Sequence, residues 1–158
     1  MPSSRPEARD EAACRKVALD LLARREHSRL ELERKLAARD YPPDVTAAVL
    51  DRLEASGALA ADRFAETFIR SRAARGQGPV RIRAELEQRG IDGGRAGELL
   101  REAGVDWYES ARRVRAKRFG AALPRDAAGR ARQARFLAQR GFAPEQIRAA
   151  LETAADSD

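Results

Sequence analysis

The chain has 158 residues, about the length of one ordinary domain, and carries a net charge of +6. It contains 33 Ala against 15 Leu, 6 Val, 4 Ile and 5 Phe, so it is rich in helix formers and poor in large apolar side chains. One cysteine and one histidine exclude an internal disulfide and a Cys/His zinc site, and we expect no metal and no cofactor. The sequence has no membrane-spanning apolar run and no secretory signal, which predicts a cytoplasmic protein without a membrane partner.

The first part of the chain predicts a three-helix repeat over residues 11–59, after a disordered N-terminus at residues 1–10. A first helix is expected at 11–25. Ser28 and Glu31 have the spacing of a capping box, which predicts the start of a second helix. Pro42 ends that helix, Pro43 begins a third, and Gly57 is suited to end it.

The same pattern recurs twice, at a spacing of about 50 residues. It predicts a second three-helix repeat at 60–105, a third at 106–152, and a frayed C-terminus at 153–158. The aligned apolar positions are Leu36 with Leu86 and Leu137, and Tyr41 with Ile91 and Phe142. The expected fold is all-α, with three tandem three-helix repeats that resemble helix-turn-helix domains. Three small bundles in a row predict an elongated, curved body, and we expect a monomer.

Basic residues are concentrated in the second and third repeats. Between Arg112 and Arg140 there are ten basic residues and a single acid, Asp126. Such a density of like charge attracts nucleic acid or acidic protein surfaces. Arg112 with Arg115, and Arg132 with Arg135, are three residues apart, and we expect each pair to share an exposed helix face. The candidate partner-binding or nucleic-acid-binding residues are Arg63, Arg70, Arg72, Arg75, Arg81, Arg83, Arg112, Arg113, Arg115, Lys117, Arg118, Arg130, Arg132, Arg135 and Arg140.

The sequence offers no catalytic motif. The glycine-rich segment 76–79 lacks the strand and the Gly-Lys-Ser/Thr of a phosphate loop, so it predicts a turn between helices. An anion bound at the N-terminus of the helix that begins at Pro79 stays open as a hypothesis. Carboxylates at 31 and 33, and at 85 and 87, point to different helix faces and cannot form an acid–base pair. We therefore expect no enzymatic activity.

Three sequence blocks, in order, resemble the RecX family of bacterial recombination regulators over about residues 13–152. The first runs from Arg25 to Leu36 and includes the Ser28–Glu31 pair. The second begins at Asp62 and contains Gly76-Gln77-Gly78-Pro79 and the segment 89–91. The third is the segment 135–142, Arg-Phe-Leu-Ala-Gln-Arg-Gly-Phe. Because all three blocks occur at the expected spacing, the resemblance is specific.

The resemblance implies a non-enzymatic regulatory protein that uses no cofactor. RecX-like proteins bind the RecA recombinase and its filament on DNA, and they inhibit its ATPase and recombinase activities. An alternative interpretation is a direct DNA-binding protein of helix-turn-helix type, which would act by competing for DNA. Weak direct DNA binding beside RecA binding also stays open. A steep decrease of binding with salt would distinguish DNA contact through phosphates.

Overall fold

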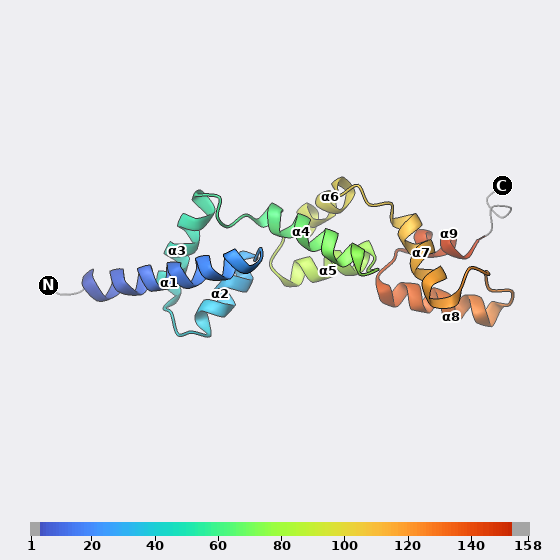
Figure 1. Cartoon of the computed structure of the whole chain (residues 1–158), viewed down its shortest axis with the longest axis horizontal. Coiled ribbons are helices and arrows are strands. Elements are labelled where there is room, and N and C mark those ends of the chain that lie inside the picture. Colours follow the sequence, from blue (N-terminus) through green and yellow to red (C-terminus); the bar gives the residue numbers. More distant parts are fainter. Residues whose placement is uncertain (1–3, 153–158) are drawn as a thin grey trace. The chain divides into compact units, whose positions relative to one another are not determined.

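The computed structural model describes residues 4–152, and within this range the chain forms nine helices and no strand (Figure 1). The predicted all-α class and the grouping of helices into three-helix repeats are confirmed. None of the described helices is long and apolar enough to span a membrane. The helices are α1 (Ser4–Arg24), α2 (Arg29–Ala37), α3 (Pro43–Ala55), α4 (Ala61–Ala74), α5 (Pro79–Gln88), α6 (Gly93–Glu102), α7 (Trp107–Phe119), α8 (Ala127–Arg140) and α9 (Pro144–Leu151).

Local sequence signals account for most helix starts. The Ser28 hydroxyl accepts a hydrogen bond from the Glu31 amide at 3.1 Å, and the Glu31 carboxylate accepts one from the Ser28 amide at 3.0 Å, which confirms the capping box. Proline occupies the first position of α3, α5 and α9.

The N-terminus differs from the prediction. Helix α1 begins at Ser4, so the backbone of residues 4–10 is helical where disorder was expected. Pro6 does not prevent this, because amides in the first turn of a helix have no partner within the helix. The first part of the predicted disordered segment, residues 1–3, and the predicted frayed end at 153–158 lie outside the described residues.

The chain is organised into two compact units. Unit 1 comprises residues 4–67 and 88–91, and unit 2 comprises residues 68–87 and 92–152. Unit 1 therefore contains α1–α3, the first half of α4 and the segment that ends α5. Unit 2 contains the remainder of α4 and α5 together with α6–α9. The border between the units falls inside the second repeat, in contrast to the repeat borders read from the sequence.

Each repeat buries the apolar position that recurs along the sequence. Leu36, Leu86 and Leu137 are all completely buried. Burial of one such leucine side chain contributes about 1.5–3 kcal/mol. The core of unit 1 consists of Cys14, Ala18, Leu21, Leu32, Leu36, Val49, Leu50, Leu53 and Leu59. Around α7–α9 in unit 2, the core consists of Ala111, Leu137, Phe142 and Ala150, with Val114, Phe136 and Ile147 packed against it.

Two turns of unit 2 are joined through their backbones. The Gly78 amide donates to the Arg140 carbonyl at 2.8 Å, and the Val80 amide donates to the Gly141 carbonyl at 2.9 Å. The free amides at the start of α5 are thus satisfied by carbonyls at the end of α8. A Cβ on Gly78 would overlap the Gly141 carbonyl group, and Gly141 has a φ of +95°. This glycine junction fixes the α4–α5 turn against the α8–α9 turn.

Candidate functional site

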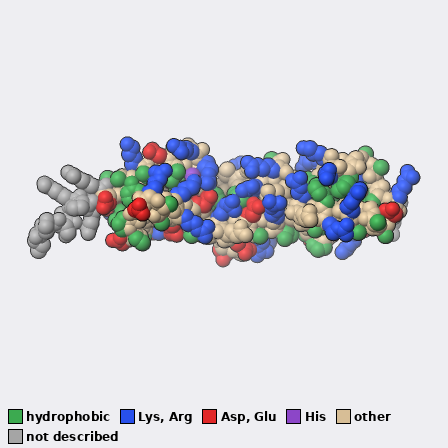
Figure 2. Space-filling model, turned by 90° about the horizontal axis from the view of Figure 1, so that it is seen from below, with side chains coloured by type: hydrophobic (Ala, Val, Ile, Leu, Met, Phe, Trp, Pro, Cys, Tyr) green, Lys and Arg blue, Asp and Glu red, His purple; other side chains and the backbone are tan. Residues whose placement is uncertain are grey.

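The structure brings seven of the predicted site residues together on unit 2. They surround two adjacent cavities between the α4–α5 turn, α7 and α8. Many Lys and Arg side chains and few Asp and Glu side chains lie over the α7–α9 region in Figure 2. We call this surface the basic groove, and its cations are Arg75, Arg113, Lys117, Arg118, Arg132, Arg135 and Arg140.

The two cavities share a wall. The first has a volume of about 620 Å³ and the second about 570 Å³, and both are lined by Arg118 and Phe136. The rings of Phe119 and Phe136 are 5.3 Å apart and nearly perpendicular. The guanidinium of Arg118 lies 5.9 Å from the Phe136 ring centre, and that of Arg140 lies 5.3 Å from it. Cation–π contacts of this kind hold charged side chains in place along the groove.

Arg115 is the clear error in the predicted set. Its side chain is only 4% exposed, so it does not share an exposed face with Arg112. The guanidinium donates to the carbonyl oxygens of Gly120, Ala121 and Ala122, and to the side-chain oxygen of Gln133. Arg115 follows the buried Ala111 by four residues, so it lies on the inward face of α7. It shapes the α7–α8 loop and is not available to a partner.

Several other predicted residues are paired inside the protein. In unit 1, Arg63 contacts Glu26 and donates to the carbonyls of Gly57 and Ala58. In unit 2, Arg72 lies over the Phe68 ring at 4.6 Å and 3.7 Å from Glu85. Ion pairs also join Arg81 to Glu85, Arg83 to Glu87 and Arg112 to Glu109. Arg70 is exposed outside the groove, and Arg130 lines a separate cavity against α9.

The hypothesis of an anion at the start of α5 is wrong for this structure. The amides of Gly78 and Val80 already donate to the carbonyls of Arg140 and Gly141. Because Pro79 has no amide hydrogen, the first turn offers no free pair of donors to a ligand. The amides of this α4–α5 turn instead bind the α8–α9 turn within unit 2.

Sequence reasoning missed two residues of the groove. Phe136 packs against the core around α7–α9, but it is only half-buried and also lines both cavities. Ser110 also lines the first cavity, and its hydroxyl is buried without a hydrogen-bond partner among the described residues. A serine inside a helix gives no such signal in the sequence. The described residues contain no cluster of three or more His, Cys, Asp and Glu suited to a metal ion.

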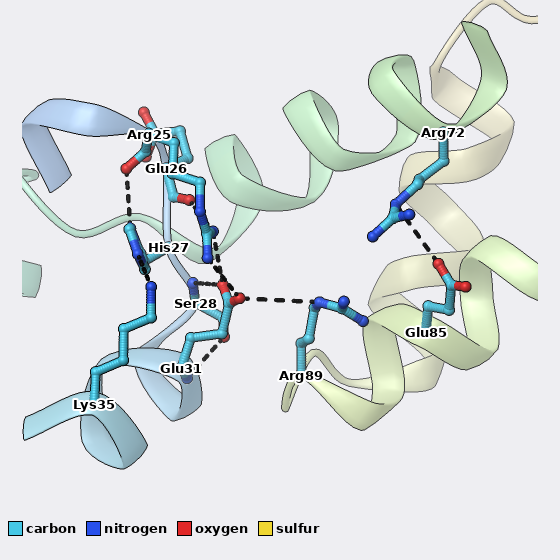
Figure 3. A network of polar contacts seen from close by, with 9 residues as sticks. All are labelled: Arg25, Glu26, His27, Ser28, Glu31, Lys35, Arg72, Glu85 and Arg89. Atoms are coloured by element: carbon cyan, nitrogen blue, oxygen red, sulfur yellow. Dashed lines mark hydrogen bonds and ion pairs between the residues drawn. The ribbon is translucent and has the colours of Figure 1, made fainter. Parts of the chain in front are cut away.

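Unit 1 contains a different kind of polar cluster, centred on the α1–α2 turn (Figure 3). Glu31 lies 3.1 Å from Arg25 and 4.0 Å from Arg89. His27 is 1% exposed; one ring nitrogen contacts the Arg25 carbonyl at 3.0 Å and the other contacts the Lys35 amine at 2.9 Å. Burial of the ring is the main reason that the pKa of His27 lies below 6.5, and the positive charges of Arg25 and Lys35 lower this pKa further. The hydrogen bond to the Arg25 carbonyl and the negative charge of Glu31 raise the pKa, but they do not offset the decrease. These contacts are internal and support a structural role.

We expect the stability of unit 1 to fall as the pH drops below 6.5. The unfolded chain then binds a proton at His27 that the folded chain does not, so acid favours unfolding until the pH passes below the folded pKa. Denaturant unfolding at several values between about pH 5 and about pH 8 measures this dependence. Because His27 is the only histidine, His27→Gln should flatten the profile in this window. An unchanged slope in that variant would assign the dependence to another group.

The chain matches known proteins along most of its length. The RecX models of a first, a second and a third three-helix domain match residues 14–53, 62–100 and 105–151. The regulatory protein RecX of Halorhodospira halophila is 52% identical, over 92% of this chain and 91% of the relative. That of Pseudomonas savastanoi pv. phaseolicola is 50% identical, over 85% and 87%.

Solved structures share the fold. The crystal structure of RecX from Lactobacillus salivarius superposes with a TM-score of 0.78 at 22% sequence identity, over 90% of this chain and 95% of the other. A second crystal structure, of a regulatory protein RecX, has a TM-score of 0.76 at 20% identity, over 90% and 72%. With its three matched domains and its relatives at about half identity, this chain belongs to the RecX family of regulatory proteins.

Proposed function

We propose that this protein binds the RecA recombinase in its filament on DNA and inhibits RecA's ATPase and recombinase activities. Membership of the RecX family supports a regulatory role, and the family resemblance points to RecA as the partner. The protein itself needs no catalytic group for this function, because occupation of the filament is enough to block it.

The observation that carries the proposal is the basic groove of unit 2. Seven cations line it, and no carboxylate does. The exposed arginines of α5, by contrast, are paired with Glu85 and Glu87. A surface with unneutralised charge attracts an acidic partner and speeds association. We infer that the groove is the face that meets the RecA–DNA filament.

A four-residue charge reversal tests this assignment. Arg113, Lys117, Arg132 and Arg135 of the basic groove are exposed on α7 and α8, and their replacement by Glu should preserve the fold. We expect the variant to need at least about tenfold more protein to inhibit the DNA-dependent ATPase of RecA, which corresponds to about 1.4 kcal/mol or more of binding free energy. The measurement is steady-state ATP hydrolysis by RecA with substoichiometric amounts of this protein.

A matched control distinguishes the loss of the groove's charges from the effect of a changed net charge. Arg15, Lys16, Arg34 and Arg39 are exposed in unit 1, and their replacement by Glu changes the net charge by the same amount. We expect this control to inhibit RecA nearly as well as the parent. If the groove variant keeps its helical circular dichroism and inhibits as strongly as the control, the groove is not the contact surface.

Direct competition for DNA is the second candidate function, and the absence of carboxylates from the groove lining favours it. Competition predicts that inhibition disappears when DNA is added in excess over RecA. Binding to the filament predicts that inhibition persists, because the protein follows RecA onto the additional DNA. The ATPase assay with increasing DNA therefore distinguishes the two functions.

A further inference from the structure

The first cavity of the basic groove is formed by two repeats within unit 2. The α4–α5 turn contributes Arg75 and Gly76, α7 contributes Arg113 and Lys117, and α8 contributes Arg140. Its volume of about 620 Å³ is within the range of about 300–1,000 Å³ that is typical of small-molecule sites. The remaining wall is formed by Ala73, Ala74, Ser110, Val114, Arg118 and Phe136.

The charges of this cavity are not balanced by the protein. Five of its eleven lining residues are Arg or Lys, and none is Asp or Glu. Among the described residues, Arg75, Arg113 and Lys117 form no ion pair with a carboxylate. Like charges gathered around one cavity repel one another, and a bound anion removes that cost. The cavity therefore favours an anionic ligand.

The backbone segments that carry these cationic residues are fixed before any ligand binds, and one of the side chains is anchored as well. Arg113 and Lys117 are four residues apart on α7, so their side chains are neighbours on one helix face. The glycine junction fixes the turn that carries Arg75, through the bonds of Gly78 and Val80 to the α8–α9 turn. Arg140 is anchored against the Phe136 ring at 5.3 Å. Pre-organisation of this kind reduces the entropic cost of binding.

The hydroxyl of Ser110 is a second sign of an unfilled site. Ser110 is 1% exposed, and its Oγ has no hydrogen-bond partner among the described residues. A buried hydroxyl without a partner is costly, and a ligand oxygen next to the cavity wall can accept its hydrogen bond.

We propose that this cavity is a phosphate-binding site, with Arg75, Arg113 and Lys117 as its charged donors and Ser110 as a neutral donor. A phosphate group offers several acceptor oxygens to donors that approach from different helices, and arginine forks match its geometry. The proposal concerns the ligand of the same groove that we assign to the filament contact, but it does not require RecA to be the partner.

Two sources can supply such a phosphate. One is the backbone of a nucleic acid strand, and the other is a free phosphate compound such as a nucleotide. The second cavity continues the groove from Arg118 past Phe119 to Arg132 and Arg135, which gives a strand room for further phosphates. A free phosphate compound would use the first cavity alone.

The test measures binding without RecA, so its failure is separate from failure of the inhibition proposal. Isothermal titration calorimetry with inorganic pyrophosphate measures binding of a free phosphate, and fluorescence anisotropy with a dye-labelled oligothymidylate measures binding of a strand. The site variant is Arg75→Gln, Arg113→Gln and Lys117→Gln. The matched control, Arg15→Gln, Lys16→Gln and Arg34→Gln, removes the same charges from exposed positions of unit 1.

We expect the site variant to bind at least about tenfold more weakly than the control, since it lacks several charge-assisted hydrogen bonds. For the oligothymidylate, the slope of log K against log salt should also become shallower by about 0.7 for each phosphate that the variant no longer neutralises. An uncharged methylphosphonate oligomer should not bind. Binding of pyrophosphate supports a free phosphate as ligand, and binding of the oligomer alone supports a strand. The proposal is overturned if neither probe binds, if both variants bind equally, or if the methylphosphonate oligomer binds as well as the oligothymidylate.

Discussion

Replacement of Gly141 by alanine is expected to destabilise unit 2 by about 3 kcal/mol or more. The left-handed backbone of this residue, with a φ of +95°, costs an alanine about 1–2 kcal/mol. Its Cβ would also overlap Arg81 of α5, whose amide nitrogen is 2.8 Å from the Cβ position. The two turns must then separate, and each of the Gly78 and Val80 amides loses its hydrogen bond at a cost of about 1–3 kcal/mol.

Gly104→Ala is the matched control for this prediction. Gly104 has a φ of +71°, but a Cβ at that position meets nothing within 4 Å. The control therefore carries the backbone strain without the collision. Denaturant unfolding gives the free energies, and hydrogen exchange at Gly78 and Val80 reports whether the junction has opened. Equal destabilisation by the two substitutions would show that the close contact between Gly141 and Arg81 contributes nothing to the stability of unit 2.

Replacement of Arg115 by methionine is expected to cost about 3 kcal/mol or more. Methionine keeps an unbranched apolar stem but lacks the guanidinium, so it removes every donor to the carbonyls of Gly120, Ala121 and Ala122 and to Gln133. A hydrogen bond to a charged group contributes about 1.5–3 kcal/mol. Lysine cannot restore all of these hydrogen bonds, because it lacks the planar fork of arginine. Urea unfolding measures the decrease in stability, and proteolysis within 120–126 should become faster.

Arg112→Met is the control on the same helix. Arg112 is exposed and lies 3.8 Å from Glu109, so its removal should change the stability by about 0.5 kcal/mol or less. If Arg115→Met proves as mild as Arg112→Met, the buried guanidinium is not what holds the α7–α8 loop.

Helix positions could be read from the sequence because their signals are local. The capping box of Ser28 and Glu31, and the prolines at 43, 79 and 144, act on backbone groups within a few residues. The groove could be predicted only as a concentration of charge, because Arg75 and Arg113 come from different repeats. Their meeting depends on the junction of Gly78 with Gly141, residues that are far apart in the chain.

The error at Arg115 has the same origin. An arginine on a helix is exposed in most proteins. The acceptors for Arg115 come from the α7–α8 loop and from Gln133 of α8, which only the tertiary fold brings to it. The Ser110 hydroxyl likewise gains its significance from a cavity that the sequence does not show. Tertiary contacts decide which of the many basic residues are structural and which are free to bind.

The division of the second repeat between the two units affects how fragments of this protein can be made. A fragment cut after residue 59, at the repeat border, would lack Arg63, which bonds to Glu26 and to the carbonyls of Gly57 and Ala58. It would also lack Arg89, which lies beside Glu31. Exchange of whole repeats between relatives would break the same interactions wherever the paired residues differ. A truncation or a chimera should therefore keep Arg63 and Arg89 together with the residues of unit 1 that they contact.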